Sequence, residues 1–261
     1  MKDYLPKELF PEYDTLIFAD TETTGLSAVD NNVIELGAVQ YKRDIIGCWC
    51  REEDQSDLIR LPEGLSIPEE VTKINHITNA MLEESGISAK AAFGKFASMI
   101  DGKTLFIAYN AHFDMNFMVH EYENRDPEHY DAIAGLDVYD AMLTARARIK
   151  GSDGRKASHK LEDILYYHGI TDVENSHRAL ADVESLIAVT EVFFKEKNDL
   201  SSAINIFPYY EKYGIPQDHL TDEKFIFMNQ SDISEKWPPT MVVPNAEELK
   251  NIKAGMSTIS R

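Results

Sequence analysis

The sequence predicts an α/β domain in which a mixed central sheet is flanked by helices, followed by a small C-terminal appendage. The first 50 residues contain three apolar or β-branched segments, which favours strands that lie close together in the chain. After residue 100 the pattern changes to a strand followed by segments with apolar residues at helical spacing. With 261 residues and 43% hydrophobic content, the chain can bury one main core.

The first strand is predicted at residues 15–19, after an irregular lead-in at residues 1–13. Strands at 33–41 and 45–50 have β-branched and apolar composition and are expected to pair through the charged turn between them. Residues 51–66 are polar and are expected to lack regular structure. An antiparallel run of three strands therefore begins the domain.

The middle of the chain is predicted to alternate helices with one strand. Short helices are expected from Pro68 and Ala80. A longer helix begins at Ser88, whose hydroxyl can cap the first turn, and ends at Gly102. A strand at residues 104–109 follows.

The second half is predicted to be mainly helical. One helix follows residues 110–114, and others are expected at 141–149, 160–168 and about 178–195. The main domain then covers residues 14–196. The remaining part, residues 197–261, is interpreted as the appendage, with a short helix near residues 246–253.

The composition favours a soluble cytoplasmic protein. No apolar segment approaches the length of a membrane span, and the first eleven residues carry charges and prolines where a signal peptide would be apolar. Cys48 and Cys50 are interpreted as packing thiols, since there is no further cysteine to complete a metal site. The net charge of −19 argues against non-specific binding to polyanions, but not against an enzyme whose carboxylates hold cations.

Two acids stand at the end of the first predicted strand. Asp20 and Glu22 are two residues apart, so their side chains share one face of the strand. Carboxylates in such a place repel each other unless a cation or a shared proton lies between them. For these two acids alone, a polar strand end leading into a turn is an equally simple interpretation.

Three further residues have the chemistry to join them. Asp114 follows a predicted buried strand at the start of a helix, and His177 precedes a helix that carries Asp182. Each has a structural alternative. Asp114 could be an acid favoured by the helix dipole, His177 a histidine in a turn, and Asp182 a solvated helix residue.

In this order and spacing, the residues resemble the DnaQ-like exonucleases of the histidine-bearing subgroup, called DEDDh. The resemblance covers about residues 14–196. Arg178 stands where a sister subgroup has tyrosine, and His76 departs from the glycine that relatives often have before the Ile-Thr pair. The motifs are Asp20-Thr21-Glu22-Thr23-Thr24-Gly25-Leu26, Asn110-Ala111-His112-Phe113-Asp114 and His177-Arg178-Ala179-Leu180-Ala181-Asp182.

The resemblance implies a ribonuclease H-like fold and a two-metal hydrolysis of phosphodiesters. Asp20, Glu22, Asp114 and Asp182 would hold two Mg²⁺ or Mn²⁺ ions, hard cations that favour carboxylate oxygen. His177 would be the general base. The expected activity is release of nucleoside 5′-monophosphates from the 3′ end of single-stranded nucleic acid. DNA is the favoured substrate, and the expected enzyme is either free-standing or the proofreading subunit of a DNA polymerase.

The resemblance also implies substrate contacts. Backbone near Thr23 would meet the terminal 3′-hydroxyl, and Leu26 would wedge against the last base. Ile77, Asn110 and His112 are further candidates for substrate binding.

Other features remain open between two interpretations. The basic segment at residues 146–160 either guides the nucleic-acid backbone or is a solvated loop. His159, like His112, is assigned to structure or substrate contact and not to catalysis.

Three alternative functions are weighed. An RNA-trimming exoribonuclease of the same family would use the same metal site. An aspartyl phosphatase fits poorly, because it normally has aspartate where Glu22 stands. A non-catalytic module that binds nucleic acid or a polymerase would be favoured by the loss of a metal acid, and none of the four is missing.

Overall fold

The fold is built on one mixed sheet. The computed structural model describes residues 3–171, 178–197, 200, 203–206 and 240–259. The sheet has the strand order β1-β4-β3-β2-β5-β6-β8, in which β2, β5 and β6 run parallel and the other neighbours are antiparallel. Its strands are β1 (Tyr4–Leu5), β2 (Thr15–Thr23), β3 (Val33–Arg43), β4 (Trp49–Leu58), β5 (Thr104–Ala108), β6 (Asp137–Asp140) and β8 (Ile204–Ile206).

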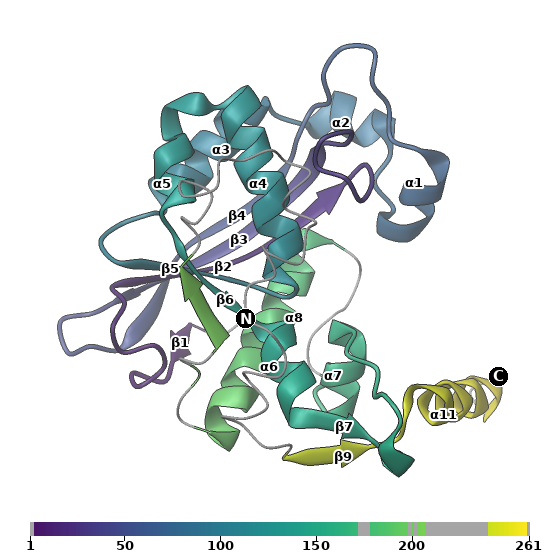
Figure 1. Ribbon diagram of the computed structural model, residues 1–261. Helices are drawn as coiled ribbons and strands as arrows, with labels where there is room; N and C mark the ends of the chain where they lie inside the picture. Colours follow the sequence, from purple (N-terminus) through teal and green to yellow (C-terminus); the bar gives the residue numbers. More distant parts are fainter. Residues whose placement is uncertain (1–2, 172–177, 198–199, 201–202, 207–239, 260–261) are drawn as a thin grey trace.

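Helices cover this sheet, as predicted. Figure 1 shows α3, α4 and α5 gathered at the top of the view, with the small parallel pair of β7 (Ile149–Gly151) and β9 (Met241–Val243) at the bottom. None of the helices in the described ranges is long and apolar enough to cross a membrane. The helices are α1 (Glu69–Asn75), α2 (Asn79–Ser85), α3 (Ala89–Ser98), α4 (Ala111–Arg125), α5 (Tyr130–Ala134), α6 (Ala141–Arg148), α7 (Leu161–Tyr167), α8 (Ala179–Glu196) and α11 (Ala246–Ile259), with short 3₁₀ turns at Pro127–His129 and Ser152–Gly154.

The central strand β2 is longer than predicted. Its residues 16–19 are fully buried, as their apolar side chains require, but the strand continues through Asp20 and Glu22 to Thr23. Pairing with β3 explains the extension, because Asp20 lies opposite Gly37 and Glu22 opposite Glu35. The two acids therefore occupy fixed positions in the sheet.

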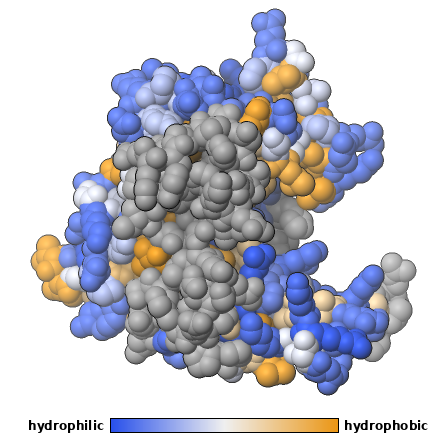
Figure 2. Space-filling view, viewed as in Figure 1, coloured by the Kyte–Doolittle hydropathy of each residue, from blue (hydrophilic) through white to orange (hydrophobic). Residues whose placement is uncertain are grey.

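The strand predicted at residues 45–50 pairs with β3 as expected but begins later, at Trp49, so the prediction was wrong for residues 45–48. Ile45 and Ile46 are exposed in the turn, where the Asp44 carboxylate accepts hydrogen bonds from the backbone N–H groups of Ile46 and Cys48. Figure 2 shows this hydrophobic end of the β3–β4 hairpin at the left of the molecule.

Strand β4 instead runs through the polar segment that was expected to be irregular. The sequence lacks the alternating apolar pattern of a strand here, because only Trp49 and Gln55 of β4 are buried. The Gln55 amide donates to the carbonyl of Ala92 in α3 at 2.8 Å, which satisfies this polar group in the interior.

Three short strands of the central sheet have no counterpart among the predicted elements. β1 lies in the expected irregular lead-in and pairs with β4, while β6 precedes α6. β8 comes from the segment assigned to the appendage and pairs antiparallel with β6. The central sheet therefore continues past residue 196.

Helix α8 approaches the sheet most closely at Gly37. A β-carbon at this position would lie 2.5 Å from the backbone carbon of Ala179 and from the backbone nitrogen of Leu180. The missing side chain lets the first turn of α8 rest directly on β3. This contact sets the distance between α8 and the acids on β2.

We expect Gly37→Ala to destabilise the protein by about 1–3 kcal/mol, since backbone must move to admit the methyl group. Gly94→Ala in α3 is the matched control, because its nearest neighbour is 3.9 Å away and alanine favours a helix. Urea unfolding followed by circular dichroism measures both. Equal stability of the Gly37 variant and the wild type would contradict the tight contact.

Candidate active site

Three carboxylates from distant parts of the chain converge at the end of β2. One oxygen each from Asp20, Glu22 and Asp182 lies within 4.8 Å of the others. Asp20 and Glu22 share a face of β2, and Asp182 is in the first turn of α8. The structure thus brings together three of the four predicted metal ligands.

The fourth, Asp114, lies beside this group in the first turn of α4. Its side chain is buried, and one carboxylate oxygen accepts hydrogen bonds from the Thr21 backbone N–H at 3.0 Å and the Thr21 hydroxyl at 2.8 Å. Thr21 points to α4, whereas its neighbours Asp20 and Glu22 point to α8. Helix α4 therefore places Asp114 on one face of the end of β2, and α8 places Asp182 on the other face.

Burial and mutual repulsion raise the pKa values of these acids. For Asp20 the largest cause is burial, followed by the charges of Asp114 and Asp182, and its pKa lies well above the usual range. Burial raises the pKa of Glu22 to about 8, against an opposing hydrogen bond from Asn75. The pKa of Asp114 rises to about 7, mainly by burial and despite its bonds to Thr21.

The chemistry of this group fits a divalent cation. Buried carboxylates are costly when charged and unpaired, and a hard cation both offsets the repulsion and takes oxygen ligands. Raised pKa values in a cluster of acids are also typical of functional sites.

A buried ion pair fixes the start of α8. Glu35 on β3 is 1% exposed and accepts from the Arg178 guanidinium Nε at 3.0 Å and Nη2 at 2.6 Å. The same carboxylate accepts from the Ala179 backbone N–H at 3.0 Å. Because Asp182 is one turn further along, this pair orients its carboxylate too. Neither Glu35 nor Arg178 was a site candidate, although both lie in segments that carried the family resemblance.

His177, the predicted general base, lies outside the described residues, directly before Arg178. Its catalytic role stays a prediction.

The predicted substrate contacts have different surroundings. Leu26 is 85% exposed in the loop after β2, as a wedge requires. The Thr23 hydroxyl donates to the Gly25 carbonyl at 2.6 Å. Ile77 is fully buried in a cluster with Ile34, Ile67 and Leu82, and substrate binding by this residue stays a prediction.

The second motif forms a tight strand-to-helix junction. Asn110 has a left-handed backbone with φ of 66°, and its N–H donates to the Asp140 carboxylate at 3.0 Å. His112 is half-buried in α4, close to Asp114 in sequence. Substrate binding by Asn110 and His112 stays a prediction.

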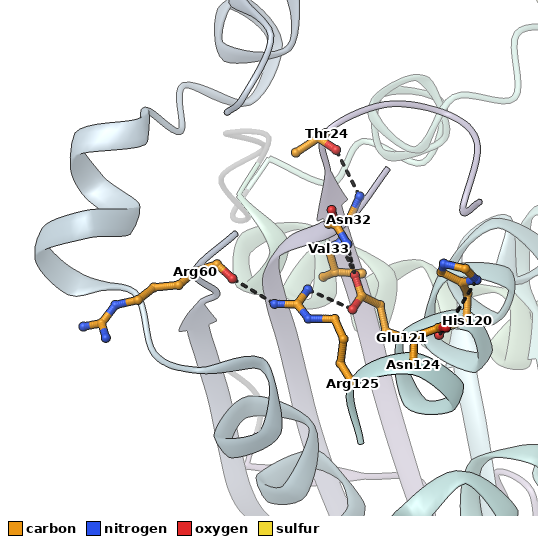
Figure 3. A network of polar contacts seen from close by, with 8 residues as sticks. All are labelled: Thr24, Asn32, Val33, Arg60, His120, Glu121, Asn124 and Arg125. Carbon is orange, nitrogen blue, oxygen red and sulfur yellow. Dashed lines mark hydrogen bonds and ion pairs between the residues drawn. The ribbon is translucent and has the colours of Figure 1, made fainter. Parts of the chain in front are cut away.

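A polar network fastens the loop that follows β2. Figure 3 shows the buried Glu121 of α4, which accepts from the Val33 backbone N–H at 2.8 Å and the Asn32 amide at 3.3 Å. Arg125 donates to Glu121 at 2.8 Å and to the Arg60 carbonyl at 2.8 Å. Sequence patterns could not indicate this network, since the residues named here come from three separate segments of the chain.

The basic segment is partly used inside the protein. Arg148 is fully buried and donates to the Phe193 carbonyl, while Arg155 pairs with Glu247 of α11 at 3.2 Å. His159 Nε2 donates to the Ile149 carbonyl at 3.1 Å, and burial lowers the pKa of His159. Arg155, Lys156 and Lys160 are exposed, so guidance of the nucleic-acid backbone by this segment stays a prediction, while a structural place for His159 is supported.

Comparisons with known proteins agree on one family. The sequence profile of a family described as Exonuclease matches residues 17–190. The chain is 34% identical over 165 residues to DNA polymerase III subunit epsilon of Treponema pallidum, covering 62% of this chain and 68% of that protein. It is 25% identical over 254 residues to the PolC-type DNA polymerase III of Staphylococcus aureus, covering 95% of this chain and 15% of that protein.

Solved structures support the fold. Escherichia coli exonuclease I in complex with a dT13 oligonucleotide superposes with a TM-score of 0.59 at 19% identity, covering 72% of this chain and 43% of that chain. The present chain thus spans less than half of exonuclease I and a small part of the PolC-type polymerase.

Without divalent cations, the thermal midpoint of unfolding should fall as the pH rises. The pKa of Glu22 is about 8 when folded against 4.5 in the reference state, so the folded protein binds more protons between these values. This contribution to stability is complete below about pH 4.5 and is lost as the pH rises through about 8. Differential scanning calorimetry in the presence of a chelator, from pH 6 to 9, measures this change in the thermal midpoint.

Glu22→Gln should flatten this dependence, whereas the control Glu69→Gln, on the exposed surface of α1, should not. Mn²⁺ at about 100 times its dissociation constant should stabilise the wild type by about 2.7 kcal/mol. A wild-type midpoint that is the same in chelator and in Mn²⁺ at pH 8 would contradict a cation site here.

Proposed function

The chain belongs to the DnaQ-like family of 3′-to-5′ exonucleases, and from that premise we propose that it removes nucleoside 5′-monophosphates from the 3′ end of single-stranded DNA. The predicted ribonuclease H-like fold is confirmed by the sheet topology and the structural neighbours. The observation that carries the proposal is the convergence of Asp20, Glu22 and Asp182 beside Asp114.

Two Mg²⁺ or Mn²⁺ ions are the proposed cofactors. When bound, such ions supply an activated water and stabilise the leaving oxygen of the phosphodiester. Asp20, Glu22, Asp114 and Asp182 would hold them. Thr21 keeps the Asp114 carboxylate turned toward β2 through its two hydrogen bonds.

The proton of the attacking water would go to His177. An imidazole with an ordinary pKa of about 6.5 is largely neutral at pH 7.5 and can accept it. The ion pair of Arg178 with Glu35 holds the first turn of α8, which carries Asp182. Leu26, exposed beside the strand end, would pack on the last base.

DNA and a role in proofreading are supported by the relatives. The epsilon subunit and the PolC-type protein are named as parts of DNA polymerase III, and the exonuclease I structure holds a deoxyoligonucleotide. A polymerase subunit is thus the proposed partner and the cytoplasm the proposed location. The presence of all four acids argues against the non-catalytic module, and the family argues against the aspartyl phosphatase.

We expect a 5′-labelled single-stranded DNA oligonucleotide to be shortened from its 3′ end in Mg²⁺ or Mn²⁺. A matched RNA oligonucleotide should be degraded at least about 10-fold more slowly, because contacts to the 2′ position discriminate the two. Denaturing gels over time give both rates. Faster loss of RNA would favour the exoribonuclease, and intact oligonucleotides in both metals would favour the binding module.

His177→Ala should lower kcat by at least about 100-fold, the usual scale for a lost general base. His129→Ala is the matched control, because this histidine pairs with Asp126 next to α5 and away from the acids. Steady-state digestion of the same DNA measures both variants. A near-normal rate for His177→Ala would remove this residue from the mechanism.

A further inference from the structure

The side chain of Asn75 contacts the acid cluster from the end of α1. Its Nδ2 donates to Glu22 Oε2 at 3.2 Å, and Asn75 itself is 1% exposed. This residue is 53 positions away from Glu22 in the chain and belongs to a helix that contributes no predicted ligand. Its hydrogen bond is therefore a link between the α1–α2 turn and the proposed metal site.

A second hydrogen bond determines which way the amide faces. Asn75 Oδ1 accepts from the Ile77 backbone N–H at 3.1 Å. A backbone N–H can only donate, so the carbonyl oxygen of the amide must be on that side and the NH₂ group must face Glu22. The amide is thus oriented to donate to a carboxylate.

The turn around Asn75 is built to hold this orientation. His76 has a left-handed backbone with φ of 61°, which ends α1 and turns the chain back so that Ile77 N–H reaches Asn75. The Thr72 hydroxyl donates to the Ile77 carbonyl at 2.9 Å and closes the same turn. Ile77 is buried, which fixes the turn to the interior.

We propose that Asn75 is a positioning residue for Glu22: its amide holds one carboxylate oxygen so that the carboxylate is turned to the cation. The inference rests on the proposed function. The other groups near Glu22 include Asp182, Glu35 and Asp114, all of which repel its carboxylate. An oriented neutral donor steadies Glu22 among them without adding a charge. Partners that orient metal-binding carboxylates in this way are typical of metal sites.

Asn75→Ala should weaken Mn²⁺ binding by about 10–100-fold, the usual effect of losing such a partner. Thr72→Ala is the comparison variant: it removes one hydrogen bond of the same turn but leaves the Asn75 amide available to Glu22, so it should lose clearly less Mn²⁺ affinity than Asn75→Ala. Isothermal titration of the whole chain with Mn²⁺ measures both. In digestion of single-stranded DNA, the Mn²⁺ concentration for half-maximal rate should rise by the same factor, with KM for DNA unchanged.

A double-mutant cycle with Glu22→Gln tests whether Asn75 acts through Glu22. In that background Asn75→Ala should have no further effect on Mn²⁺ affinity. If Asn75→Ala does not fold, Asn75→Asp replaces it, since aspartate keeps the size and the acceptor for Ile77 but loses the donor; its effect should also depend on Glu22.

Three results would overturn the proposal: unchanged Mn²⁺ affinity in Asn75→Ala, an equal loss in Thr72→Ala, or additive effects in the cycle. These outcomes are independent of the proposed function. A wild type that binds Mn²⁺ but leaves DNA intact would refute the exonuclease, while the Mn²⁺ titrations would still decide the role of Asn75.

Discussion

Repulsion among buried carboxylates is the constraint on which the site depends. Asp20, Glu22, Asp114 and Asp182 come from one strand and two helices, and each raises the cost of ionising the others. Neutral donors and one ion pair hold them in place: Thr21 binds Asp114, Asn75 binds Glu22, and the pair of Arg178 with Glu35 fixes the helix of Asp182. The remaining negative charge can be offset by a bound cation or, without one, by protons that the acids retain at raised pKa values.

The sheet and α8 determine where these carboxylates lie relative to one another. Strand β2 presents alternate side chains to the two helices, so Thr21 meets α4 while Asp20 and Glu22 meet α8. Gly37 allows α8 to lie against β3 with backbone in contact, and Glu35 accepts from its first turn. Acids about 160 residues apart therefore meet through two adjacent strands.

The sequence predicted the elements whose pattern is decided locally. β2, β3 and α8 carry clear apolar periodicity, and the motifs placed Asp20, Glu22 and Asp182 correctly in one cluster. Most of β4 was missed because its buried Gln55 is polar, and the sequence does not show that this side chain donates to a carbonyl in α3. The short strands at the sheet edges have too few residues for a pattern. The supports Asn75 and Glu35 depend on partners 53 and 143 positions away, which periodicity cannot show.

The edges of the sheet have a consequence for the protein in concentrated solution. An open strand offers unpaired backbone groups to other chains and so promotes aggregation. Here the outermost strands β1 and β8 span only two and three residues. The part of β4 beyond β1 carries Glu52 and Glu53, whose like charges would oppose those of a second copy aligned beside it. Negative charge on this edge strand thus opposes self-association, just as negative charge in the acid cluster favours a bound cation.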